Sequence, residues 1–363
     1  MLCLSLSYIV NKLYILFVLF IAVATFLYCA DVVSNKISVA KSNFVVFSLT
    51  SILVILPGLL IKDIHPEYFK QAIIMFAMIC SGFLLAEMKA FNLFLSRLPF
   101  FVISLYYFAL HVHGVPMSYA LSSNSENFVS VSLFLAYFLS FALSKKYQVE
   151  FIVLIMAGVI LFLSVISIGR SGIVTSAFLF IFTALLYFHY GLKQLNPRLM
   201  RASIYLFFLS FAYFAVSVSL QVLLDAGLLE RIVNRGFTDY SRWFIISDYF
   251  SRLYDLRSLL GGVDVYLVDA YSKYGYNLHN SYLSIHSIFG LAFFIIYTLL
   301  LVQVSFWLVL KKNAVLLIPW VAILVRALTD IQVLGGKLDW VLYFLVFIQL
   351  QGVIKRNRAQ QEK

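Results

Sequence analysis

The sequence predicts an all-α, polytopic membrane protein with about eleven (10–12) transmembrane helices and one large loop outside the membrane. Hydrophobic residues make up 63% of the 363 residues and charged residues only 12%, whereas soluble domains carry about 25% charged residues. The apolar residues form continuous runs and do not alternate with polar ones. Only helices and closed barrels satisfy the backbone in hydrocarbon, so continuous runs indicate helices.

Each expected span is an apolar run close to the length of about 20 residues that crosses a bilayer. The runs lie at 13–30, 43–61, 69–86, 98–113, 127–143, 151–168, 172–190, 203–220, 282–310, 314–329 and 338–354. The first run follows Lys12 but is not followed by a small-residue cleavage site, so we expect a retained span and not a signal peptide. We expect residues 1–363 to form a single integral membrane domain.

The orientation follows from Lys and Arg, which are enriched in cytoplasmic loops. One set of alternate loops, together with the C-terminal tail, holds fifteen of these residues, and the other set of short segments holds five. This difference places the C-terminus in the cytoplasm and the long loop 221–280 outside. Much of the net charge of +11 is then positive-inside bias, so we expect no nucleic-acid partner.

The outer loop is expected to contain a short amphipathic helix, 241–260, that ends at Gly261-Gly262. At about 100° per residue, one face of this helix is apolar. That face comprises Trp243, Ile246, Phe250, Leu253, Leu256 and Leu260. We expect the helix to lie on the membrane surface or on the bundle of spans. Arg242 projects from its apolar side, where a long arginine stem often simply covers apolar surface.

A second unusual arginine, Arg170, stands between two apolar runs in the sequence GRSG, with Gly169 and Gly172 beside it. It lies on the predicted outer side, where basic residues are few. A charged residue at such a junction is either an anchor for lipid headgroups or part of a functional site.

Two of the six histidines, His279 and His286, lie seven residues apart where the outer loop meets the ninth span. The imidazole of His279 can change its charge near neutral pH, and Asn280 beside it can donate and accept hydrogen bonds. His286 is expected two helical turns deeper, where it could orient His279 or line a cavity. Gly290 is expected inside the span, where a glycine permits close helix packing. By spacing alone, a structural histidine at a helix start is the favoured interpretation.

Three short motifs, in this order along the chain, resemble those of the O-antigen polymerase and O-antigen ligase superfamily of bacterial envelopes. The first is the element GRSG around Arg170, and the second is the pair Arg242-Trp243 followed by Gly261-Gly262. The third is His279-Asn280, nine further residues and Gly290. The ligase pattern often has Gly, Thr or Tyr where this chain has Phe293, so the resemblance favours the polymerases of the Wzy type.

The resemblance implies an inverting, metal-independent glycosyltransferase that needs no cofactor. Its donor would be a glycan on undecaprenyl diphosphate, and its acceptor a second lipid-linked repeat unit. It implies that His279 is the general base, that Arg170 and Arg242 bind the diphosphate, and that Asn280, His286 and Gly290 support them. It places the protein in the inner membrane, among membrane lipids, with its active site in the periplasm and a chain-length regulator as a partner.

Two alternatives stay open at this point. An O-antigen ligase would use the same donor and transfer the polymer to the lipid A core. A flippase or transporter for lipid-linked oligosaccharides would have internal repeats and polar residues near the bilayer midplane. We find no repeat in the sequence, and the polar residues gather on one side.

Overall fold

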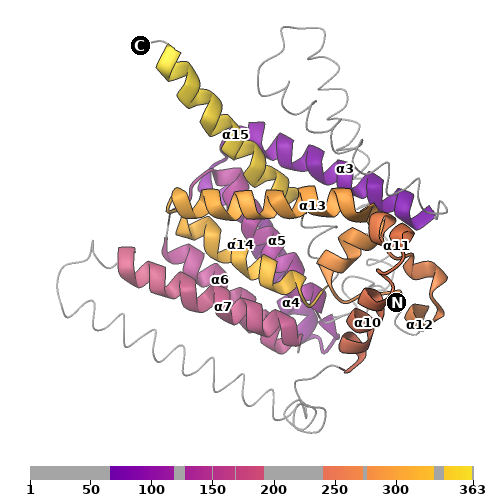
Figure 1. Ribbon diagram of the computed structural model, residues 1–363. Helices are drawn as coiled ribbons and strands as arrows, with labels where there is room; N and C mark the ends of the chain where they lie inside the picture. The colour runs from indigo at the N-terminus through magenta and orange to yellow at the C-terminus, as the bar shows by residue number, and fades with distance from the viewer. Residues whose placement is uncertain are drawn as a thin grey trace. The chain divides into compact units, whose positions relative to one another are not determined.

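A computed structural model describes residues 66–117, 127–148, 150–167, 169–191, 240–272, 276–330 and 339–361 (Figure 1). Every regular element within these residues is a helix, which confirms the all-α class for this part of the chain. The predicted spans 13–30, 43–61 and 203–220 lie outside the described residues, as does the first part of the predicted loop, 221–239. The described helices belong to two compact units.

The first unit contains the following helices: α4 (Leu93–Val112), α5 (Asn127–Ser144), α6 (Phe151–Ile166), α7 (Arg170–Leu186) and most of α14 (Ala314–Ala327). A short π-helix, η2 (Tyr187–Gly191), extends α7. Within this unit α5 packs against α4, α6 and α7. The connections from α5 to α6 and from α6 to α7 are short, so these helices pack as neighbours in the order of the sequence.

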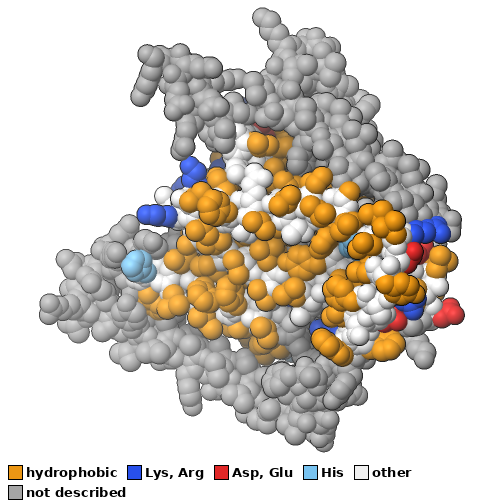
Figure 2. Space-filling model, in the orientation of Figure 1, with side chains coloured by type: hydrophobic (Ala, Val, Ile, Leu, Met, Phe, Trp, Pro, Cys, Tyr) orange, Lys and Arg blue, Asp and Glu red, His pale blue; other side chains and the backbone are white. Residues whose placement is uncertain are grey.

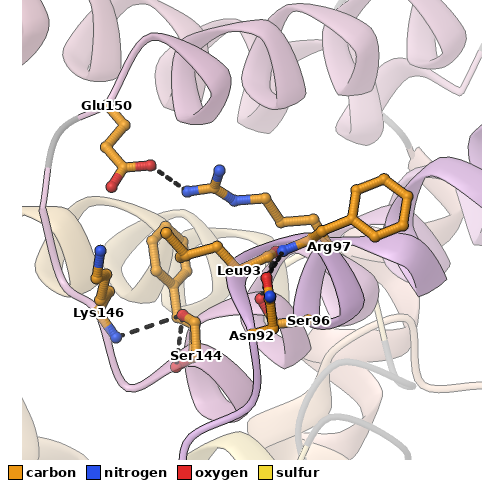
Figure 3. Close-up of polar contacts among 9 residues, drawn as sticks. Asn92, Leu93, Ser96, Arg97, Ser144, Lys146 and Glu150 are labelled. Atoms are coloured by element: carbon orange, nitrogen blue, oxygen red, sulfur yellow. Dashed lines mark hydrogen bonds and ion pairs between the residues drawn. The ribbon is translucent and has the colours of Figure 1, made fainter.

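Two connections of the first unit meet at one end of its helices (Figure 3). Asn92 caps the start of α4 by accepting a hydrogen bond from the Phe94 amide at 2.9 Å. The Arg97 guanidinium pairs with the Glu150 carboxylate just before α6. The Phe91 amide donates to the carbonyl of Leu143 at 2.9 Å. The segments before α4 and after α5 are therefore neighbours, as the predicted alternation of loops requires.

The second unit contains α3 (Pro66–Glu87), α13 (Ser281–Leu310) and α15 (Asp339–Gln361), together with the short helices of the predicted loop. These short helices are α10 (Tyr240–Ser251), α11 (Leu256–Gly261), η4 (Val265–Leu267) and α12 (Asp269–Ser272). Helices α3 and α15 pack closely because Gly82 has no side chain. A Cβ there would lie 2.6 Å from the backbone nitrogen of Phe344.

Four helical segments among the described residues are long and apolar enough to cross a membrane: Tyr68–Glu87, Leu93–Val112, Ser171–His189 and Ser281–Leu310. Four further apolar helical segments are shorter: Phe128–Ser144, Phe151–Ile166, Ala314–Ala327 and Asp339–Gln351. These eight coincide with eight of the predicted spans. Hydrophobic side chains cover most of the described surface on the face in Figure 2, and Phe94, Leu105, Val174, Leu299 and Phe306 are among the exposed ones. Such a surface is compatible with a membrane protein.

Candidate active site around the start of α13

The described part of the predicted loop has a hydrophobic core of its own. Its buried residues are Ile245, Tyr249, Val263, Val265, Tyr271 and Leu278. The Tyr68 hydroxyl, in the first turn of α3, donates to the Asp264 carboxylate at 2.7 Å. The loop is thus a folded platform attached to the start of a helix that is long enough to span a membrane.

The prediction of one helix over 241–260 is wrong, because the segment forms two helices, α10 and α11, separated by turns at 252–255. Asp255 is the physical reason for the break. Its carboxylate accepts hydrogen bonds from the backbone and the hydroxyl of Ser258, at 3.0 and 3.1 Å, and so caps the start of α11. Aspartate favours this capping position over a helix interior. These hydrogen bonds also lower the pKa of Asp255.

An ion pair closes the end of α10 just before this break. The Arg252 guanidinium donates to both carboxylate oxygens of Asp248, at 2.9 and 3.3 Å. Burial raises the pKa of Asp248, but polar contacts, led by the hydrogen bonds from Arg252, outweigh this effect and hold the pKa below its usual value. The carboxylate therefore stays ionised at neutral pH and balances the charge of Arg252.

The predicted apolar face of α10 is also not the face that packs inward. Ile245 and Tyr249, one helical turn apart, are fully buried, whereas Trp243 and Phe250 are 73% and 57% exposed. The predicted apolar face is therefore exposed, and a second face, which includes a tyrosine, packs into the platform. The hydroxyl of Tyr249 is buried together with its ring because it has a hydrogen-bonding partner.

That partner is His286, in the second turn of α13. The Tyr249 hydroxyl lies 2.7 Å from His286 Nδ1, and His286 Nε2 lies 2.8 Å from the carbonyl oxygen of Leu259 in α11. A carbonyl only accepts, so Nε2 carries the proton, and in the neutral ring Nδ1 accepts from Tyr249. Burial raises the pKa of Tyr249, which keeps its hydroxyl protonated as the donor. His286 thus joins both loop helices to α13.

Gly262, which ends α11, contacts the backbone of α13 at the same place. Its φ is 84°, and a Cβ built on it would lie 2.0 Å from the carbonyl oxygen of His286. One residue later, the carbonyl of Val263 accepts a hydrogen bond from the Ser287 hydroxyl at 2.8 Å. Gly261-Gly262 was predicted as a helix stop, which is confirmed. The structure adds that the second glycine lets two backbones touch.

Replacing Tyr249 by Phe should destabilise the platform, because the buried Nδ1 of His286 would lose its donor. An unsatisfied buried polar group costs about 1–3 kcal/mol. We expect a lower thermal midpoint for the detergent-solubilised Tyr249→Phe protein. Tyr254→Phe is the matched control, since Tyr254 is 91% exposed. Equal midpoints for the two variants would show that the Tyr249–His286 bond contributes nothing.

His279 is held between two fixed neighbours. Leu278 before it is buried in the core of the platform, and Asn280 after it caps α13 by accepting from the amides of Tyr282 and Leu283 at 2.9 and 3.1 Å. His279 itself is half-buried and has a left-handed backbone with φ 50°, and its amide donates to the Asn277 side chain at 2.7 Å. Histidine tolerates this conformation better than most residues do. The structure therefore fixes the backbone of this residue outside the helix.

Gly290 lies within α13, as predicted, but it also has a backbone role that its spacing did not indicate. Gly290 has φ 78° and ψ 176° and interrupts α13 with a kink. This backbone conformation is essentially restricted to glycine. Residues 281–289 and 291–310 are consequently two helical pieces with separate axes.

The two predicted diphosphate-binding arginines belong to different units. Arg242 lies in the first turn of α10, in the same unit as His279, His286 and Gly290. Arg170 is the first residue of α7 in the other unit, so its membership of the same site stays a prediction. Among the residues that the structure describes, no group of three His, Cys, Asp or Glu is placed to hold a metal ion.

Arg326, inside the tenth predicted span, is not among the predicted site residues, but the structure brings it to the GRSG element. In the structure Arg326 is 1% exposed, and its Nη1 donates to the Thr175 hydroxyl of α7 at 3.2 Å. A Cβ on Gly172 would lie 3.3 Å from the same nitrogen and 2.4 Å from the Ser130 hydroxyl. A side chain at position 172 would therefore press first on Ser130 and then on this buried arginine.

Comparisons with protein-family models, with curated proteins and with solved structures found no match for this chain.

Proposed function

We propose that this chain is a glycosyltransferase that polymerises undecaprenyl-diphosphate-linked O-antigen or related repeat units on the periplasmic face of the inner membrane. The observation that supports it best is the junction at His279. A partly exposed imidazole is held between a buried anchor, Leu278, and a helix cap, Asn280. A fixed, accessible histidine where a polar platform meets an apolar helix suits a general base that acts on an amphiphilic substrate.

In the proposed reaction, an acceptor sugar hydroxyl attacks the anomeric carbon of the donor glycan. A new C–O bond forms on one face while the C–O bond to the diphosphate breaks on the other, which inverts the configuration. His279 takes the proton of the attacking hydroxyl. The diphosphate leaves with the bonding electron pair, and Arg170 and Arg242 neutralise its developing charge through bidentate hydrogen bonds.

A ligase would carry out the same donor chemistry on a different acceptor. Phe293, the residue that favours polymerase in the resemblance, is buried in α13 with its ring centroid 4.8 Å from that of Phe289 and 5.7 Å from that of Tyr297. It is a packing residue in this fold, so the choice between polymerase and ligase depends on an experiment with whole cells.

That experiment is the lipopolysaccharide ladder of a strain that lacks this gene. A lost polymerase leaves the core with one repeat unit, and a lost ligase leaves no attached O-antigen. A lost flippase also prevents attachment, but its intermediates stay on the cytoplasmic side. We expect the first pattern, restored by the gene supplied on a plasmid, and either of the others would refute the proposal.

Replacing Arg170 or Arg242 by Lys should reduce polymerisation, because lysine keeps the charge and loses the bidentate fork. A hydrogen bond to a charged group is worth about 1.5–3 kcal/mol, which corresponds to a rate lower by about 10- to 100-fold. The measurement is turnover of a lipid-linked repeat unit by purified protein in vesicles. Arg97→Lys, at the ion pair with Glu150 at the start of α4, is the control. Full activity of both test variants would refute the arginine clamp.

The same assay should tolerate a chelator. We expect EDTA to leave turnover unchanged, because the two arginines supply the positive charge that a metal ion would otherwise bring to the diphosphate. Loss of activity in EDTA, with recovery on addition of Mg²⁺ or Mn²⁺, would overturn the metal-independent mechanism.

A further inference from the structure

The two loop helices present a surface of large apolar side chains that the core of the platform leaves outside. We call it the α10–α11 surface, and it consists of Trp243, Ile246, Phe250, Tyr254, Leu256 and Leu260. Trp243, Ile246 and Phe250 follow one another at the i, i+3, i+7 spacing of a helical stripe. Tyr254 is 91% exposed and Leu256 66%. Figure 2 shows hydrophobic and charged side chains intermingled over α10, α11 and α12.

The α10–α11 surface belongs to a platform that is bonded near the starts of two long apolar helices. The platform is joined to the first turn of α3 by Tyr68–Asp264 and to the second turn of α13 by the hydrogen bonds of His286. Both helices are long and apolar enough to cross a membrane; α13 exposes large apolar side chains between Ile295 and Leu310, and α3 exposes Phe69 and Ile73 near its start. The α10–α11 surface therefore lies at the ends of two helices whose own outer faces suit lipid.

The chemistry of the surface matches the boundary between lipid headgroups and acyl chains. Trp and Tyr are enriched at this level of a membrane. Arg242 precedes Trp243 and Arg257 follows Leu256, so a cation flanks the apolar residues of each helix. Arginine binds phosphate through a planar fork of donors.

We propose that the α10–α11 surface is inserted into the outer boundary of the bilayer, with Arg242 and Arg257 at the level of the lipid phosphates. The occupant of the surface is thus the lipid bilayer itself. One consequence rests on the function proposed above. The diphosphate of a polyprenyl-linked donor lies at the same level, so insertion would hold Arg242 at the depth where that group arrives.

Spin labels on the full-length protein in vesicles of phosphatidylethanolamine and phosphatidylglycerol test the insertion. Single cysteines replace Trp243 or Phe250 in a background without Cys3, Cys29 and Cys80. Leu299→Cys, on the exposed face of α13, serves as the lipid reference, and Ser272→Cys, an exposed polar position in α12, as the water reference. Oxygen concentrates in lipid and a water-soluble nickel chelate stays outside, so the ratio of their effects on relaxation of the label reports depth.

We expect oxygen to enhance the relaxation of the labels at 243 and 250 more than the nickel chelate does, as at 299. At 272 the chelate should have the larger effect. Labels at 243 and 250 that behave like the one at 272 would show that the surface faces water. Labels shielded from both reagents would show that protein covers it. Either result would overturn the proposal.

A second variant separates this proposal from the proposed function. Trp243→Ser combined with Leu256→Ser should move a label at 250 to the water-like order and should also lower polymer formation. If the label moved to the water-like order and polymer formation stayed normal, the insertion of the surface would be supported. The proposed role of Arg242 in the reaction would then be refuted. If the label kept its lipid-like order in this double variant, the two residues would not hold the surface in the bilayer and the proposal would fail.

Discussion

A protein with Asn or Ala in place of His279 should reach the membrane at a normal level and form no polymer. The imidazole would supply general-base catalysis to the acceptor hydroxyl, which is worth about 100- to 10,000-fold in rate. A loss of that size reduces the polymer ladder to single repeat units. The measurement is the ladder, normalised to the amount of protein in the membrane fraction.

The left-handed backbone of His279 makes the Asn variant the more informative one. A non-glycine residue held in such a conformation costs about 1–3 kcal/mol, so an Ala variant can fail through strain alone. Asparagine tolerates this backbone and has no base that titrates near neutral pH. His113→Ala, at an exposed histidine that ends α4, is the control. A normal ladder from His279→Asn at normal protein level would refute the general-base role.

His286 is not a suitable control for this experiment. Its ring holds α10 and α11 through Tyr249 and Leu259. An alanine at 286 removes both hydrogen bonds and leaves a cavity, so it should lower stability together with activity. If His279→Asn retained polymer, His279 would not be the general base, whatever the result for His286→Ala.

The second large effect is expected from Gly262→Ala. The added methyl group would lie 2.0 Å from the carbonyl oxygen of His286, on a residue whose φ of 84° already disfavours any side chain. Backbone strain costs about 1–3 kcal/mol, and the overlap between two main chains adds to it. We expect the platform to separate from α13, with rapid proteolysis of 240–272 and a lower thermal midpoint.

Gly114→Ala is the matched control for this substitution. Gly114 also has a positive φ, 66°, but a Cβ built there would meet nothing within 4 Å. The control therefore measures the strain of the backbone without the overlap. If the two variants were equally stable, the close contact between α11 and α13 would not contribute to the stability of the protein.

The sequence predicts the helices well because their signal is local. Eight predicted apolar runs are helices in the structure. A continuous apolar run predicts a helix from its own residues alone, because in a low-dielectric surrounding a helix satisfies the backbone within the run. Gly261-Gly262 as a helix stop and a junction at Asn280 are local signals too. The break between α10 and α11 was missed, although Asp255 is a good helix cap, because the apolar periodicity continues through it.

The contacts of the site were less predictable because they join residues far apart in the chain. Tyr249 and His286 are 37 residues apart, and Thr175 and Arg326 are 151 residues apart. Neither pair has a spacing that periodicity can detect. Gly290 was read as a packing glycine, since its positive φ is a property of the backbone and leaves no mark in the apolar pattern around it.

The kink at Gly290 also sets the length of α13 that matches a bilayer. An unbroken helix of 30 residues would be about 45 Å long, whereas the hydrocarbon core is about 30 Å thick. Residues 291–310, beyond the kink, measure about 30 Å. In the proposed topology, this piece alone would span the hydrocarbon, and 281–289 would lie at an angle to it among the headgroups. A substitution that straightened the helix would create hydrophobic mismatch, and tilting to relieve it would shift His279 away from its depth.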